Sequence, residues 1–261
     1  MACSLQQFVA DTRDQQQKQA AAFEVEKQCF LQVNLGTPSS TGGILSQVWI
    51  KTGSMVAYQG DCKFEREGMM DHGFSNMLKK SFTGEGASLV KASTKSRAQL
   101  YLADNSKRVT VLFLQGESIV VNGDDLLAFE PSISHKITMM KKLSSIVSGG
   151  LFNVKLQGQG FVAILSHGQP LTLMVAPGYP PVFTDPQATV AWSGDLVPDF
   201  KSDVGLKTLI GRSSGETFQM KFDGSRGQGF VVVQPHEEVP ASSGSSGGGG
   251  SGTLSNIANI F

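Results

Sequence analysis

The sequence predicts a mainly β protein, and two observations lead to this fold class. Many short runs of alternating apolar residues are separated by turn residues every 6 to 12 positions, which is typical of an all-β sandwich or barrel-like stack. Three stretches also read as a short helix, a Gly-rich turn and an alternating strand, and their turn glycines Gly84, Gly149 and Gly215 lie 65 and 66 residues apart. A regular period of this kind indicates three internal repeats.

We expect the chain to have three parts. Residues 1–22 form an N-terminal helical segment, because residues 4–22 are rich in Gln and Ala and contain no Gly or Pro. Leu5, Phe8 and Val9 give that helix a small apolar stripe. Residues 23–236 form the three-repeat β domain, with short helices between the repeats. Residues 237–261 form a flexible Gly/Ser-rich tail, whose last nine residues, TLSNIANIF, are either a docking motif or a disordered end.

Strands are expected wherever apolar residues alternate between turn signals. In the second unit these are residues 98–104, 107–114, 117–121 and 126–130, and in the third unit residues 152–156, 161–165, 171–175 and 181–184. We expect turns at Gly116 and at Gly158–Gly160, and a hairpin at Asn122–Gly123. The last strand, around residues 230–233, is expected to complete a sheet that the N-terminal strands begin.

Composition excludes several classes of protein. The 22 basic and 22 acidic residues balance, whereas nucleic-acid binders usually carry a basic excess. No apolar run approaches the roughly 20 residues of a membrane-spanning helix, and the N-terminus lacks the features of a secretory signal. The cysteines Cys3, Cys29 and Cys62 have no CxxC spacing, which favours a reducing compartment and buried, inert thiols. We therefore expect a cytoplasmic protein.

The strings VWIKTGSMVAYQGDCKFEREG, LKKSFTGEG and GLFNVKLQGQGFVAI resemble the altered inheritance of mitochondria protein family over about residues 23–236. The family's members have a fold similar to that of the tryptophan RNA-binding attenuation protein. The resemblance implies a β-sandwich or double-stranded β-helix-like body, often oligomeric, with no established catalytic residues. It also implies a link to mitochondria.

Motifs for metal or cofactor binding are weak. His72, His135, His167 and His236 are far apart in the sequence, and a zinc site needs three or four converging ligands. Nothing in the sequence requires the fold to bring His135 and His167 together. Residues 158–163 match a loose GxGxxA pattern, but a strand is expected after it where dinucleotide binding needs a helix. We expect neither a metal nor a cofactor.

Two pairs of acidic residues are candidates for acid–base chemistry. Asp124 and Asp125 follow the Asn–Gly turn, and Glu65 and Glu67 flank Arg66. Carboxylates in turns are usually solvated, whereas catalytic pairs need burial that separates their pKa values. We therefore expect no catalytic residues and no enzyme activity.

One patterned feature favours an anionic ligand. Basic residues recur in or beside the three expected helices, and a ring of them about a pseudo-threefold axis would attract RNA or acidic lipid. The alternative is that these charges only keep the helices soluble. The residues concerned are Lys79, Lys80, Lys141, Lys142, Lys207 and Arg212.

The sequence thus leaves three functions open. The first is a non-enzymatic β protein that acts as a homo-oligomer or through a protein partner. The second is an anion-binding module for RNA or a membrane surface, and the third is a β-sandwich that binds a small molecule.

Overall fold

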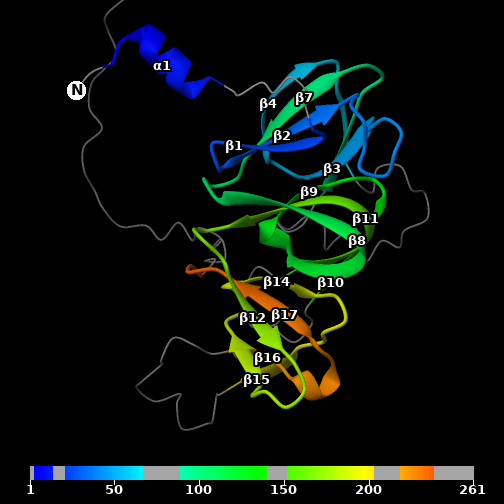
Figure 1. The fold of residues 1–261 in the computed structure, drawn as a ribbon, viewed down its shortest axis with the longest axis vertical. Coiled ribbons are helices and arrows are strands. Elements are labelled where there is room, and N and C mark those ends of the chain that lie inside the picture. Colours follow the sequence, from blue (N-terminus) through cyan, green and yellow to red (C-terminus); the bar gives the residue numbers. More distant parts are fainter. Residues whose placement is uncertain (1–2, 14–20, 67–88, 140–151, 203–217, 238–261) are drawn as a thin grey trace, which may run out of the picture.

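The computed structural model describes residues 3–13, 21–66, 89–139, 152–202 and 218–237. The mainly β class is confirmed: the described residues contain one α-helix and three antiparallel sheets (Figure 1). The helix, α1 (Leu5–Thr12), begins at Ser4, whose side chain accepts a hydrogen bond from the Gln7 amide. None of its side chains is buried, so its apolar stripe of Leu5, Phe8 and Val9 stays exposed.

A small sheet and a large sheet contain most of the strands. The small sheet has the order β1 (Phe23–Glu26), β2 (Phe30–Leu35), β7 (Ala98–Leu102), β4 (Met55–Gly60). The large sheet has the order β12 (Leu171–Val175), β17 (Gly229–Val233), β14 (Thr189–Ser193), β8 (Arg108–Asn122), β11 (Phe152–Ser166), β9 (Leu126–Phe129), β3 (Gln47–Lys51), β6 (Leu89–Ser93), β5 (Lys63–Arg66). A further strand, β10 (Ile133–Met139), pairs with β11.

The third sheet has the order β13 (Val182–Thr184), β16 (Phe218–Phe222), β15 (Asp199–Ser202). Two 3-10 turns, η1 (Gly123–Asp125) and η2 (Gly224–Arg226), precede β9 and β17. The third sheet lies at the lower end of the molecule in Figure 1, together with β12 and β17.

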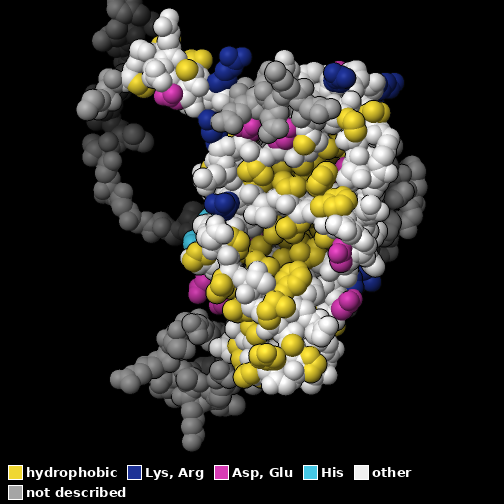
Figure 2. Space-filling view, viewed as in Figure 1, with side chains coloured by type: hydrophobic (Ala, Val, Ile, Leu, Met, Phe, Trp, Pro, Cys, Tyr) yellow, Lys and Arg dark blue, Asp and Glu magenta, His cyan; other side chains and the backbone are white. Residues whose placement is uncertain are grey.

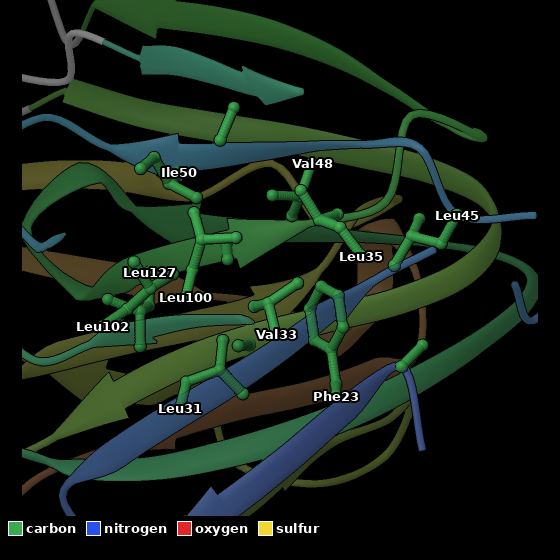
Figure 3. Packing of buried hydrophobic residues seen from close by; sticks show 14 of the residues in the cluster. Phe23, Leu31, Val33, Leu35, Leu45, Val48, Ile50, Leu100, Leu102 and Leu127 are labelled. Carbon is green, nitrogen blue, oxygen red and sulfur yellow. The ribbon is translucent and has the colours of Figure 1, made fainter. Parts of the chain in front are cut away.

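Three apolar clusters hold the sheets together. In the first, Leu31, Val33 and Leu100 of the small sheet pack against Val48 and Ile50 of the large sheet (Figure 3). The second lies among strands of the large sheet alone. The third joins β12, β14 and β17 to the third sheet. Alternation along each strand sends every second side chain to one face, which explains why the short strands have apolar residues at every second position.

The long strands β8 and β11 are the centre of the large sheet. They pair along almost their whole lengths, with one break in register at which Gly116 and Glu117 of β8 lie opposite Gly158 of β11. Two residues opposite one is a β-bulge, which bends a strand without ending it. Gly116 and Gly158 both have positive φ values, +109° and +135°, which glycine adopts without steric cost. The turns expected at Gly116 and at Gly158–Gly160 are therefore wrong: they are bends inside two continuous strands.

A buried ion pair closes the bend of β8. Lys107 precedes the strand and Asp125 follows it, yet the Lys107 Nζ lies 2.9 Å from the Asp125 Oδ1. Their side chains are only 2% and 0% exposed. A straight strand of this length would separate its ends by about 50 Å. The strand must therefore curl back on itself until its two ends meet.

One further expectation about connections is wrong, and another holds only in part. Asn122 and Gly123 do not form a hairpin, because β8 and β9 lie on opposite sides of β11 and both pair with it. The last strand shares the large sheet with the N-terminal strand β3 but does not lie next to it, because β17 pairs with β12 and β14. In both cases the neighbours of a strand are set by pairing with residues far away in the chain, to β11 and to β14. Turn residues in the local sequence do not indicate such pairing.

The three expected helices and their turn glycines lie outside the described residues. The strands on either side of each are described, and they pair with each other: β5 with β6, β10 with β11, and β15 with β16. Each of the ranges 67–88, 140–151 and 203–217 therefore connects two adjacent antiparallel strands. The three-repeat arrangement and the sandwich arrangement stay predictions.

We expect Lys107→Met to lower the free energy of unfolding by about 3–5 kcal/mol, because it leaves the Asp125 carboxylate buried without its cation. The double variant Lys107→Met, Asp125→Leu should recover most of the loss. Urea denaturation followed by circular dichroism measures both. The matched control is Lys51→Met, which breaks a 2.6 Å pair with Asp104 that is 20% exposed on each side. Equal losses for Lys51→Met and Lys107→Met would contradict the role of the buried pair.

We also expect Gly160→Ala to lower the thermal stability more than Gly116→Ala. Both glycines have positive φ values, so alanine is strained at either position. At position 160 an added Cβ would also lie 2.6 Å from the Ser132 Oγ and 2.8 Å from the Glu130 Oε2, whereas nothing lies within 4 Å at position 116. The extra cost at position 160 should be about 1–3 kcal/mol, and equal melting temperatures for the two variants would argue against this crowding.

Candidate functional site

The basic residues proposed as an anion site lie outside the described part of the chain. This holds for Lys79, Lys80, Lys141, Lys142, Lys207 and Arg212. Their proposed ring about a pseudo-threefold axis stays a prediction.

The histidines lie in two separate places. His135 packs its ring against Trp49 and Phe129, with centroid distances of 5.4 and 5.1 Å. His167 lies against His236 instead, at 4.1 Å, and His72 is outside the described residues. Within the ranges that the structure describes, no group of three or more His, Cys, Asp or Glu side chains is placed to hold a metal ion.

Two of the four acidic residues have structural partners, and Glu67 lies outside the described residues. Asp125 is buried against Lys107, so the expectation of a solvated carboxylate is wrong for it, whereas Asp124 is exposed as expected. Glu65 lies 3.3 Å from the Lys91 Nζ on the neighbouring strand. The glycines of the GxGxxA match lie inside β11, so no helix N-terminus follows them to receive a phosphate.

A small cleft lies between the loop of residues 39–47 and the turn of residues 130–132. Its volume is about 240 Å³. The buried Glu130 carboxylate lies at its base and accepts hydrogen bonds from the Phe161 amide at 2.9 Å and the Ser40 amide at 3.1 Å, and also from the Ser40 hydroxyl. Sequence reasoning missed this carboxylate. Because Glu130 joins the loop to β11, its role in the structure is that of a clamp.

The most distinctive surface is at the lower end of the molecule. Residues 156–184 contain no Asp, Glu, Lys or Arg, although 17% of the chain is charged. From this stretch Leu171, Met174 and Tyr179 are 60%, 70% and 73% exposed. Phe183 and, in the following loop, Val197 are exposed as well. We call these five side chains the apolar end, and Figure 2 shows hydrophobic side chains gathered there, over β12 and β16.

The position of β12 explains the exposure of Leu171 and Met174. β12 is the terminal strand of the large sheet and pairs on one side only, with β17. Leu171 and Leu173 lie beside Val233 and Val231, whereas Met174 lies beside Phe230 on the opposite face. Edge strands are usually protected by charges, proline or bulges, and the sequence of β12, LTLMV, contains neither charge nor proline. Among the described strands, this edge is therefore open for pairing.

Two ion pairs lie near the apolar end. Lys221 lies 2.6 Å from the Asp223 carboxylate, and Arg226 lies 2.7 Å from the Asp199 carboxylate. The Lys221 ammonium, together with the amide and hydroxyl of Ser225, holds the pKa of Asp223 well below its ordinary value. These pairs add no net charge, so the apolar end has the composition of an interface centre, which is poor in charge and rich in aromatic residues and Met.

The absence of charge between residues 156 and 184 was visible in the sequence. Alternation within single strands does not reveal it, because the stretch spans several strands and turns. Which of these apolar residues stay exposed could not be read from the sequence, since exposure depends on β12 being at the sheet edge.

The cysteines are free thiols, as expected, but they are not all buried. Cys3 is exposed, and Cys29 and Cys62 are half-buried. Burial is the main cause that raises the pKa of the Cys62 thiol.

We therefore expect iodoacetamide to alkylate Cys62 more slowly than Cys3 at pH 7.5, with a rate for Cys62 that still rises above pH 9. The thiolate is the reactive form, and a raised pKa reduces its fraction at neutral pH. Mass spectrometry of alkylated peptides between pH 7 and pH 10 measures both rates. Equal rates at pH 7.5 would show that burial does not control Cys62.

Comparison with known proteins supports the fold. The model of a family described as mitochondrial biogenesis AIM24 matches residues 43–236. A crystal structure of a Streptococcus pyogenes protein, a structural genomics target, is similar with a TM-score of 0.61 and 21% identity, over 82% of this chain and 92% of that chain. At this identity the likeness shows the fold alone. No curated protein matches the chain.

These comparisons give no support to the finer likeness to the tryptophan RNA-binding attenuation protein. The described residues include no helix that is long and apolar enough to cross a membrane.

Proposed function

This chain belongs to the AIM24 family of mitochondrial biogenesis, and we propose that it is a non-enzymatic protein that works through protein–protein contact at the apolar end. The observation that carries this proposal is the exposure of Leu171, Met174 and Tyr179 at an uncharged sheet edge. Exposed apolar patches on soluble proteins commonly mark interaction sites, because burying them against a partner is favourable.

Self-association fits this surface. The chain has no net charge, and Lys221 and Arg226 near the apolar end are paired with carboxylates, so these charges do not oppose the approach of a second copy. An uncharged edge strand also pairs with an identical strand about a twofold axis, which gives a closed dimer.

The other two functions have less support. The basic residues that would bind RNA or acidic lipid lie outside the described residues, and no described surface adds to that hypothesis. The cleft at Glu130 is smaller than the roughly 300–1,000 Å³ of typical small-molecule sites.

We expect the double variant Leu171→Lys, Met174→Lys to weaken self-association at least about tenfold, since truncated or charged anchors at an interface centre typically cost more than 1 kcal/mol each. Sedimentation equilibrium between 1 and 200 μM measures the association constant.

The matched control is Ile44→Lys, which places a lysine at an equally exposed apolar position on a loop beside the small sheet. It should associate as tightly as the wild-type chain. Association that is equally tight in the double variant would count against the apolar end as the contact surface.

A further inference from the structure

Four observations concern what covers the open edge of β12. The strand pairs on one side only, it exposes apolar side chains on both faces, no charge lies within it, and the described chain ends close to it. Val233, the last residue of β17, pairs with Leu171, the first residue of β12. Glu237 is the last described residue, only four positions further along the chain. The segment that follows therefore starts near the end of β12 at which Leu171 lies.

We propose that residues 253–261 of the same chain, TLSNIANIF, add to the outer edge of β12 as a strand and cover the apolar end. This inference rests on the proposed function, since it names the segment that competes with a partner for that surface. An extended segment that pairs with a free sheet edge is a common mode of peptide recognition, in which main-chain hydrogen bonds supply affinity and alternate side chains supply specificity.

The sequence of the segment fits a two-faced edge. If residues 253–261 are extended, Leu254, Ala258 and Ile260 lie on one face, and Ile257 and Phe261 lie on the other. Both faces of β12 carry exposed apolar side chains, so both faces of the added strand have apolar neighbours. The segment contains no proline, so its amides are all available as donors, and it has no charged side chain to bury against an uncharged surface.

The connecting chain is long enough. Residues 238–252 are rich in Gly and Ser, and a chain of that composition and length has an end-to-end distance of roughly 20 Å. The length of β12 is about 17 Å, so the segment reaches either end of the strand. A tether this short gives an effective concentration in the millimolar range. At 1 μM protein, pairing within one chain is therefore favoured over pairing between chains by about a thousandfold.

Coverage of this kind makes the apolar end switchable. A partner or a second copy must displace residues 253–261 before it binds. The apparent affinity of that partner is therefore reduced in proportion to the fraction of molecules whose edge is covered. A nine-residue strand that pairs on one side alone is weakly held, so displacement remains accessible to a partner with a larger contact area.

Photo-crosslinking locates the segment directly. We would place p-benzoylphenylalanine at position 261 of the full chain, irradiate at 1 μM and map the crosslinks by mass spectrometry. The expected result is a crosslink within one chain to residues 171–175, lost in Leu171→Lys, Met174→Lys and kept in Ile44→Lys. Crosslinks elsewhere, crosslinks only between two chains, or no crosslink would each overturn the proposal.

Hydrogen exchange tests whether the segment pairs as a strand. Ile257→Pro removes a backbone donor from the middle of the segment, and it should speed the exchange of those amides of residues 171–175 that point away from β17 at least about tenfold. Ser251→Pro, in the linker, is the matched control and should leave these exchange rates unchanged. The exchange rates of the β3 amides should be unchanged in both variants. Unchanged exchange in Ile257→Pro would overturn the pairing. These readouts do not depend on self-association, so failure of this inference is distinguishable from failure of the proposed function.

Discussion

The buried pair of Lys107 and Asp125 is the interaction on which the rest of the structure depends. It joins the two ends of β8, and β8 with β11 forms the centre of the large sheet. A lysine and an aspartate are costly to bury unless they are paired. Because the pair forms only when the two ends of β8 are close together, burial of both side chains favours the curled form of the strand. The curl is in turn accommodated by a bulge at which Gly116 and Glu117 oppose Gly158. The two halves of the large sheet are thereby placed against different partner sheets.

That placement determines which surface remains open. One half of the large sheet packs against the small sheet through the first apolar cluster, and the other half packs against the third sheet through the third cluster. β12 follows at the far edge, with β17 on its inner side and no described strand on its outer side. Because β12 itself contains no charged residue, its edge offers apolar side chains and backbone groups for contact. Partner binding and coverage by residues 253–261 are both consequences of this one edge.

The errors of sequence interpretation have a common cause. Sequence predicts turns at Gly116, Gly158 and Asn122–Gly123 because glycine and asparagine favour positive φ values. Positive φ values do occur at Gly116 and Gly158, but in both cases inside a strand, where a bulge preserves the pairing. Local sequence specifies the backbone conformation of such a residue. It does not specify whether the strand continues on the other side, because that depends on a ladder with residues far away in the chain.

The sequence by itself determined the mainly β class, the N-terminal helix, the free cysteines and most strand positions, because alternation and helix propensity act over a few residues. It also contained the uncharged stretch of residues 156–184. Only the tertiary structure decided that Asp125 is buried, that Glu130 clamps a loop and that Leu171 and Met174 are exposed. Burial and exposure depend on which strands lie at the edge of a sheet. That order arises from long-range pairing, which a single sequence read locally does not reveal.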